Sequence, residues 1–237
     1  MVFVTGGASG IGADIVRAFA EQGSKVGFVD VLEAEGTTLA REVGGLFIPC
    51  DVTDIVALKA AIARVGTEFG PIGVLVNNAA NDARHEIDAV DEAYWDQAMD
   101  INLKHQFFAS QAVRAQMRQL GGGSIINFSS IAWRGGASNM AVYATAKAAV
   151  NGMTRALARG FSDDNIRVNS VEPGAVITER QKRLWFSAPG SVEAVVERQM
   201  IKQVLLGEHI ARTVLFLASD DAQMITKQAI TVDAGLR

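Results

Sequence analysis

The sequence is poor in the residues on which disulfide-bonded, metal-bound and nucleic-acid-binding proteins depend. Its 237 residues include one cysteine, Cys50, and three histidines, which excludes an internal disulfide and a cysteine-rich zinc site, so no metal is expected. Lys and Arg number 22 against 26 Asp and Glu, so we expect neither nucleic acid nor an anionic membrane as a partner. No apolar run approaches the roughly 20 residues of a membrane span, and the first residues lack the order of a secretory signal. These absences indicate a protein of the reducing cytoplasm.

The remaining composition is that of an ordinary globular domain. Hydrophobic residues make up 49% of the chain and charged residues 20%, which is far from the composition of disordered chains. The length matches one domain, and no internal repeat or Pro/Ser-rich linker divides the sequence. We therefore expect residues 1–237 to form a single unit.

Short apolar, β-branched runs alternate with stretches of helical period along the whole chain. Ile11, Ile15, Ala18 and Phe19, for example, recur at three- and four-residue steps before Gly23. Strands that are uniformly apolar are buried on both faces, and alternation with helices indicates right-handed crossovers. The sequence predicts a doubly wound, Rossmann-type α/β fold with seven parallel strands and helices on both faces of the sheet. The expected strands are residues 2–5, 25–30, 45–49, 73–77, 124–128, 167–171 and 229–233.

One interval interrupts this alternation. Residues 178–207 contain no strand candidate but hold Trp185, Phe186, Pro189 and Gly190, followed by a helical stretch over 192–203. A non-strand insertion late in such a fold is typical of a lid or substrate loop. The alternative is a surface helical hairpin with no role in binding.

A glycine-rich turn follows the first expected strand and opens the first helix, as Thr5-Gly6-Gly7-Ala8-Ser9-Gly10-Ile11-Gly12. The pyrophosphate of a dinucleotide binds at such a place, on the unpaired N–H groups of a helix N-terminus. Glycines are needed because a Cβ would hold the phosphate away. The candidate cofactor residues here are Gly6, Ser9, Gly10, Ile11 and Gly12; the alternative is a structural turn without a ligand.

An acidic residue, Asp30, ends the second expected strand, about 20 residues beyond the glycines, where a carboxylate accepts hydrogen bonds from the adenosine ribose. The same carboxylate would repel a 2′-phosphate. Neither Ser9 nor Val31 is a basic residue that would offset this repulsion. The sequence therefore favours NAD over NADP, with Asp30 and Val31 at the ribose. Asp30 can also cap the helix that begins near Leu32.

Two further motifs follow the third and fourth expected strands. Asp51 and Val52 are placed to meet the adenine ring, although Asp51 can equally cap a helix over 53–69. After the fourth strand, Asn77-Asn78-Ala79-Ala80 has small residues that let the backbone pass close beside a ligand. Asn78, Ala79 and Ala80 are therefore cofactor candidates; the alternative is a tight Asn-rich turn.

A tyrosine and a lysine lie four residues apart, at Tyr143 and Lys147, in a stretch of small helix-forming residues. This spacing places both side chains on one helical face. A cation within about 4–6 Å favours the phenolate and lowers a tyrosine pKa, so Tyr143 can remove a proton from an alcohol. Ser130 ends the preceding strand at the edge of the sheet where ligands bind, so it can hold the substrate oxygen. Alone, such a pair is usually an exposed helix face.

In this order, the motifs resemble those of the classical short-chain dehydrogenase/reductase family, and the resemblance extends from Thr5 to Gly235. It implies Tyr143 as general acid/base, Lys147 as the group that lowers the tyrosine pKa and holds the nicotinamide ribose, Ser130 as substrate orienter, and Asn102 as holder of a proton-relay water.

The resemblance also implies a nicotinamide pocket formed by residues 173–178. Pro173, Gly174, Val176 and Thr178 would lie beside the ring, with Thr178 and the Val176 backbone near its carboxamide. The family usually has glycine where this chain has Ala80, a small-for-small departure in the same pocket.

Substrate preference is indicated by a narrower likeness. Asn81-Asp82-Ala83-Arg84-His85 and Ser130-Ile131-Ala132-Trp133 are similar to segments of bacterial aldose 1-dehydrogenases, especially the D-xylose type, which oxidise the anomeric hydroxyl of a free sugar to a lactone. A polyol needs several convergent donors and acceptors. The candidates are Asn81, Arg84, His85, Trp133 and Gln181, each of which can instead have an ordinary surface or packing role.

Other functions of the same fold remain open. A ketone or 3-oxoacyl reductase would share the fold and the Ser-Tyr-Lys set, but would more often use NADPH, which Asp30 opposes. A non-catalytic dinucleotide sensor would be expected to lack Tyr143 or Lys147. The resemblance also implies a homotetramer, in which two long helices, over 93–119 and 142–161, pair across two-fold axes.

Overall fold

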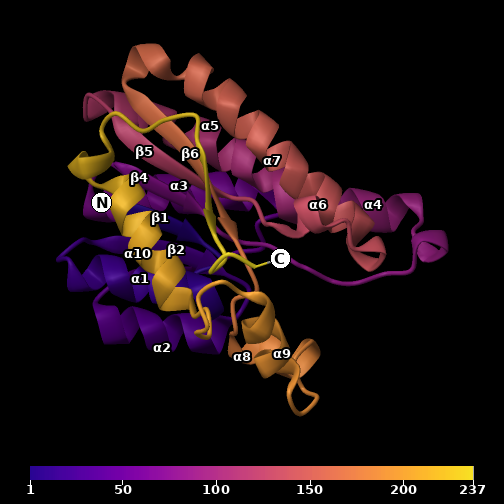
Figure 1. The fold of residues 1–237 in the computed structure, drawn as a ribbon. Helices are drawn as coiled ribbons and strands as arrows, with labels where there is room; N and C mark the ends of the chain where they lie inside the picture. Colours follow the sequence, from indigo (N-terminus) through magenta and orange to yellow (C-terminus); the bar gives the residue numbers. More distant parts are fainter. Residues whose placement is uncertain (237) are drawn as a thin grey trace.

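The computed structural model describes residues 1–236. Within them, seven parallel strands form one sheet in the order β3-β2-β1-β4-β5-β6-β7 (Figure 1). The chain order reverses between β1 and β4, which makes the carboxyl ends of these strands the place where open α/β sheets bind ligands. The strands are β1 (Val2–Thr5), β2 (Val26–Asp30), β3 (Leu46–Pro49), β4 (Val74–Asn77), β5 (Gly123–Phe128), β6 (Ile166–Pro173) and β7 (Ala229–Val232).

Helices cover both faces of the sheet, and alternate residues of each strand supply the two cores. In β1, Val2 and Val4 pack with α1 (Gly10–Glu21), α2 (Glu33–Val43) and α10 (Gly207–Ala218). Phe3, between them, packs on the opposite face with α3 (Ile55–Phe69), α5 (His105–Gln119) and α7 (Ala141–Gly160). Figure 1 shows this three-layer arrangement, with α1, α2 and α10 together on one side.

The predicted fold is confirmed, and each expected strand lies within two residues of the observed one. The strands in the middle of the sheet are buried on both faces, as their uniformly apolar sequences predicted, whereas β3 and β7, at the two edges, are only partly buried. β6 continues two residues beyond the prediction because Glu172 and Pro173 pair with Thr231 and Val232 of β7. The polar Glu172 concealed this extension in the sequence.

The long helix expected over 93–119 is wrong as a continuous α-helix. It consists of α4 (Glu92–Met99), the π-helical turn η2 (Asp100–Lys104) and α5. Asn102, inside the wide turn, donates from Nδ2 to the carbonyls of Ala98 (2.9 Å) and Asn81 (3.1 Å). Such π-helical turns are frequent at functional sites, and this one brings a polar side chain to the segment that follows β4.

The interval 178–207 contains no strand, as expected, but two short helices, α8 (Glu179–Leu184) and α9 (Ser191–Arg198), which project from the sheet in Figure 1. The expected helix over 192–203 ends early, because Gln199 is buried in extended backbone and the next two N–H groups donate to the carbonyl of Ala234. The remaining short elements are α6 (Ala132–Gly135), η1 (Ile87–Ala89), η3 (Ser138–Met140), η4 (Ser162–Asp164) and η5 (Asp220–Ala222).

In residues 1–236, none of the helices combines the length and the apolarity that a membrane crossing requires.

Candidate active site

The glycine-rich turn is shaped by close backbone contacts that leave no room for side chains. A Cβ on Gly12 would lie 1.9 Å from the carbonyl oxygen of Gly6, and a Cβ on Gly6 would lie 2.8 Å from Cα of Ala79. Gly6 also adopts φ +65°, in the left-handed region. Ser9 is the exposed N-cap residue of α1, so the first helical N–H groups of Gly10, Ile11 and Gly12 open at the carboxyl edge of the sheet. This cradle fits the pyrophosphate of a dinucleotide.

Asp30 ties the end of β2 to this turn. Its Oδ2 accepts a hydrogen bond from the Ala8 N–H (2.9 Å), and its Oδ1 accepts one from the Leu32 N–H (3.1 Å). The interpretation of Asp30 as the cap of α2 is wrong, because Leu32 is the N-cap residue and α2 begins at Glu33. The neighbouring Val31 is 63% exposed. The carboxylate therefore lies between the glycine turn and an open surface, where a ribose can reach it.

Asp51 is not a helix cap either. Its Oδ1 accepts from the N–H and the hydroxyl of Thr53, at 2.9 and 2.8 Å, in a local turn. The cap of α3 is Asp54, which accepts from the Ala57 N–H at 2.9 Å, and α3 begins at Ile55. Asp51 is exposed, whereas Val52 is buried beneath it.

The motif after β4 packs directly on the glycine turn. Asn78 Nδ2 donates to the carbonyls of Thr5 (3.1 Å) and Gly6 (2.9 Å), and the Ala79 N–H donates to the Thr5 hydroxyl (3.1 Å). Ala80 is exposed beside them. The small side chains are thus explained by close packing against Gly6.

The segment after β6 reaches the same crevice from the other end of the chain. A Cβ on Gly10 would lie 3.4 Å from Cγ2 of Thr178, so the glycine turn and Thr178 are neighbours. Thr178 is also the N-cap of α8, accepting from the Gln181 N–H at 3.2 Å. Gly174 packs against Asp233, while Pro173 and Val176 are buried.

The serine, tyrosine and lysine meet at this carboxyl edge. Lys147 is buried, and its Nζ donates to the Phe128 carbonyl at 2.8 Å and lies 5.5 Å from the centroid of the Tyr143 ring. Ser130 follows β5, its hydroxyl accepts from the Ala132 N–H at 3.1 Å, and a hydrogen bond joins it to Tyr143. The predicted i, i+4 placement of Tyr143 and Lys147 on one face of α7 is observed.

The expected direction of the Tyr143 pKa is wrong for the chain by itself. Burial, and then the negative charge of Asp82, raise the pKa of Tyr143 well above its ordinary value, although hydrogen bonding to Ser130 lowers it. Burial also lowers the pKa of Lys147 to about 7, which Asp82 opposes. Because a buried ammonium loses its hydration, Lys147 is only partly charged at neutral pH. Its charge therefore does little to favour the phenolate.

Asn102 connects this group to the segment after β4. Its Oδ1 accepts from the Asn81 N–H at 2.9 Å, and its Nδ2 donates back to the Asn81 carbonyl. The side chain is buried and holds Asn81 at both backbone groups. Asn102 thus fixes the position of the residue that begins the predicted substrate segment.

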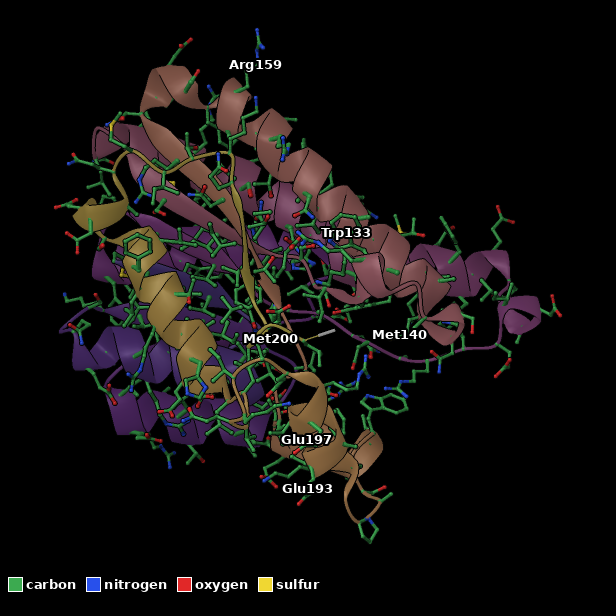
Figure 2. All side chains as sticks on the ribbon, viewed as in Figure 1. Trp133, Met140, Arg159, Glu193, Glu197 and Met200 are labelled. Carbon is green, nitrogen blue, oxygen red and sulfur yellow. The ribbon has the colours of Figure 1, made fainter. Side chains whose placement is uncertain are left out.

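The five substrate candidates occupy this region but are already engaged with other side chains. His85 Nδ1 lies 3.1 Å from the Tyr94 hydroxyl, Trp133 Nε1 donates to Glu172 (2.9 Å), and the Arg84 guanidinium stacks 4.0 Å from the Trp185 ring centroid. Gln181 Nε2 donates to Asp82 at 2.8 Å, and Asn81 Oδ1 accepts from Arg180 at 3.1 Å. Figure 2 shows Trp133 near the beginning of α7.

Sequence reasoning missed Asp82, Arg180 and Glu172. Asp82 receives Arg180, Gln181 and Trp185, whereas Glu172 is fully buried and bonded to Trp133, Arg134, Asn151 and Thr231. A glutamate at the end of an otherwise apolar buried strand was a usable signal, because charged residues are almost never fully buried unless paired. Asp82 offered no such signal in its polar segment.

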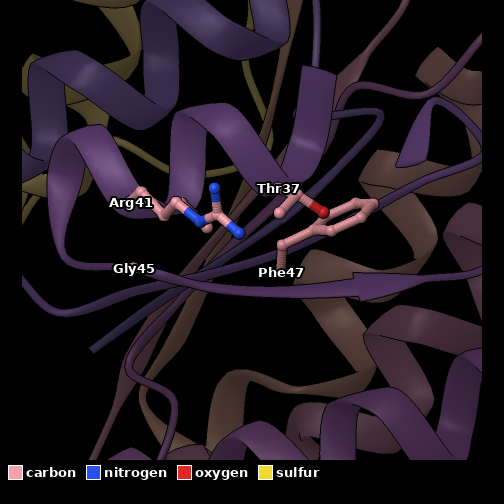
Figure 3. Close-up of a pocket in the computed structure, with 5 residues that line it drawn as sticks. Thr37, Arg41, Gly45 and Phe47 are labelled. Carbon is pink, nitrogen blue, oxygen red and sulfur yellow. The ribbon is translucent and has the colours of Figure 1, made fainter. Parts of the chain in front are cut away.

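A surface hollow elsewhere on the molecule is unrelated to this crevice. Thr37, Ala40, Arg41, Gly45 and Phe47 line about 330 Å³ between α2 and the start of β3 (Figure 3). It lies at the amino end of an edge strand, opposite the edge where the glycine turn and Tyr143 meet.

Comparisons with known proteins agree with this geometry. The family model described as enoyl-(acyl carrier protein) reductase matches residues 6–237. The chain is 44% identical to D-xylose 1-dehydrogenase of Caulobacter vibrioides, with 100% of this chain and 95% of the relative covered, and 43% identical to a probable galactose dehydrogenase of Rhizobium meliloti, with 99% and 94% covered.

Two solved structures have the same fold as this chain. A 3-oxoacyl-[acyl-carrier protein] reductase from Brucella melitensis superposes with a TM-score of 0.89 at 30% identity, covering 99% of this chain and 90% of that one. A blue fluorescent protein from a metagenomic library, in complex with NADPH, has a TM-score of 0.89 at 34% identity, with 99% and 96% covered. The chain therefore belongs to the short-chain dehydrogenase/reductase family and is an oxidoreductase that acts on CH–OH donors with a nicotinamide dinucleotide.

Proposed function

We propose that this chain oxidises the anomeric hydroxyl of a free aldose to a lactone, with NAD as the hydride acceptor. The observation that carries the proposal is the position of Ser130, Tyr143 and Lys147 beside a face of polar side chains that includes Asn81, Gln181 and Trp133. Several donors and acceptors at one edge suit a polyol better than an acyl chain. The full-length likeness to D-xylose and galactose dehydrogenases supports the same substrate class.

NAD is the proposed cofactor because of Asp30. Its carboxylate, held by Ala8 and Leu32, would accept hydrogen bonds from the ribose hydroxyls, and its charge would repel a 2′-phosphate. The adenosine and pyrophosphate would be held by Gly6, Ser9, Gly10, Ile11, Gly12, Val31, Asp51, Val52, Asn78, Ala79 and Ala80. The nicotinamide end would be held by Tyr143, Lys147, Pro173, Gly174, Val176 and Thr178. One of the similar solved structures is a complex with NADPH, so the test of this proposal measures activity with both NAD and NADP.

The mechanism follows from four side chains. Ser130 would donate a hydrogen bond to the substrate oxygen, and Tyr143, in its phenolate form, would take the hydroxyl proton at its phenolic oxygen as hydride leaves the anomeric carbon, leaving the neutral phenol. When bound, oxidised nicotinamide supplies the hydride acceptor. Lys147, anchored to the Phe128 carbonyl, would hold the ribose, while Asn102 keeps the 81–85 segment in register. The barrier is lowered by orientation and by charge stabilisation in a buried site.

The experiment is a panel of free pentoses and hexoses with NAD or NADP, followed by absorbance of the reduced cofactor. We expect turnover of at least one aldose, with NAD preferred. Silence across the panel, together with reduction of a ketone or acyl thioester, would replace the sugar proposal by its alternative. That alternative is favoured by the 35% identity to a 3-oxoacyl-[acyl-carrier-protein] reductase of Thermotoga maritima.

We also propose a homotetramer built on α5 and α7. Phe107, on α5, is 41% exposed in the single chain and would be covered if α5 pairs with a second copy. Size-exclusion chromatography with light scattering tests this, and a monomer would contradict it.

A further inference from the structure

Asp82 is held in place by the residue before it. Asn102 bonds both the N–H and the carbonyl of Asn81, at 2.9 and 3.1 Å, and its own position is fixed by the π-helical turn. The backbone that leads into Asp82 is therefore anchored to the same turn that carries a predicted catalytic residue.

The donors that meet Asp82 come from one helix and its C-cap. Arg180 forms an ion pair with Oδ1, while Gln181 Nε2 (2.8 Å) and Trp185 Nε1 (3.1 Å) donate to Oδ2. The Asp82 side chain is 18% exposed. Helix α8 has no buried residue among those described, so these polar contacts, rather than core packing, hold it against the segment after β4.

The charge of Asp82 also acts on the reacting groups. Burial is the largest influence on both Tyr143 and Lys147, but the negative charge of Asp82 raises the pKa of each. A change of charge at Asp82 is therefore expected to alter the pKa of both Tyr143 and Lys147.

We propose that Asp82 is a positioning residue of the reaction: by accepting hydrogen bonds from Arg180, Gln181 and Trp185, it fixes α8 against the segment that follows β4 and thereby sets where α8 meets the substrate. The nature of the substrate in this statement rests on the proposed function, whereas the attachment of α8 through Asp82 is independent of that function.

Other charged and titratable groups near Tyr143 and Lys147 also influence the pKa values of these two residues. Arg180 of α8 faces Tyr143 and lowers its pKa, His105 of α5 faces Lys147, and Glu172 of β6 contacts α7 one turn further on, at Asn151. All of these remain when Asp82 becomes asparagine. The variant therefore loses one negative charge, which lowers the pKa of Tyr143.

The test compares Asp82→Asn with Glu179→Gln in the full-length protein. Glu179, at the start of α8, carries the same negative charge as Asp82 but pairs with Lys182, and its side chain is 89% exposed. Glu179→Gln therefore controls for the loss of a carboxylate near α8 that does not hold the helix in place. In Asp82→Asn the amide nitrogen replaces one of the two oxygens and faces either Arg180 or the pair of donors from Gln181 and Trp185. We expect KM for the substrate to rise about 10- to 100-fold, the loss of hydrogen bonds to a charged group, with KM for NAD unchanged and the acidic limb of kcat/KM moved to lower pH.

Limited trypsin digestion supplies a measurement that needs no substrate. The bonds after Arg180, Lys182 and Arg183 all lie in α8, and we expect their cleavage to be faster in Asp82→Asn but not in Glu179→Gln. Wild-type kinetics and an unchanged pH limb in Asp82→Asn would overturn the proposal, as would unchanged cleavage. A wild-type enzyme inactive on all sugars would refute the proposed function alone, and the same comparison would then use the ketone that it reduces.

Discussion

The cofactor crevice and the substrate face lie side by side but are built differently. The crevice is made by backbone: glycines without room for a Cβ, and backbone groups bonded to the neighbouring turns, as the Ala8 N–H is to Asp30 and the Gly6 carbonyl is to Asn78. The substrate face is made by long side chains that meet across the fold, as do Asp82 and Arg180, 98 residues apart. Backbone geometry tolerates few alternatives, whereas side-chain networks can be rebuilt around a new substrate. The first region is therefore suited to a constant cofactor and the second to a variable substrate.

The largest effect should come from Tyr143→Phe, which removes the ionisable group with little change of shape. We expect turnover to fall by at least the roughly 10²–10⁴-fold typical of general acid–base catalysis, with NAD binding nearly intact by titration calorimetry. This result would show that Tyr143 serves the reaction with the substrate and is not needed for binding NAD. A variant that keeps its activity would refute the assigned role.

Glu172→Gln tests whether the substrate face depends on its buried network. The amide nitrogen would face donors from Trp133, Asn151 or Thr231, so we expect a loss of about 1–3 kcal/mol of unfolding free energy, the cost of an unpaired buried group. Urea unfolding measures it. The exposed pair Arg17–Glu42 is the control, since Glu42→Gln should change the unfolding free energy much less than Glu172→Gln does. Equal effects in the two variants would contradict the comparison.

Asp30→Ala should narrow the preference for NAD over NADP by roughly tenfold, because a hydrogen-bond acceptor for the ribose and a charge that repels phosphate are both lost. The ratio of kcat/KM for the two cofactors measures this, with substrate KM as the internal control. An unchanged ratio would show that the crevice does not select its cofactor through this carboxylate.

The last test concerns the pH dependence of stability. The folded Lys147 releases its proton near pH 7, whereas the unfolded chain holds it to about 10.5. The unfolded state binds more protons between these values, so this residue makes stability rise with pH across that window. Lys147→Met should flatten the rise, measured by urea unfolding at pH 6.5, 8 and 9.5. The Phe128 carbonyl keeps a donor in the variant, from Gln106. An unchanged slope would contradict the burial of the charge.

Sequence periodicity was sufficient for the sheet because a parallel strand must be apolar on both faces and its neighbours must be helices. It failed at Asn102 and at Gln199, where the α-helix widens or stops. In both cases a side chain or backbone group finds a partner far away in the sequence, at Asn81 and at Ala234. Local propensity does not contain such contacts.

The sequence by itself determined the fold, the position of the glycine cradle and the shared helical face of Tyr143 and Lys147, since each depends on local spacing and strand order. Only the tertiary structure decided the ionisation of those two residues and the partners of Asp82 and Glu172. Ionisation depends on desolvation and on charges brought close by folding, and a carboxylate acquires its partners only when distant segments meet.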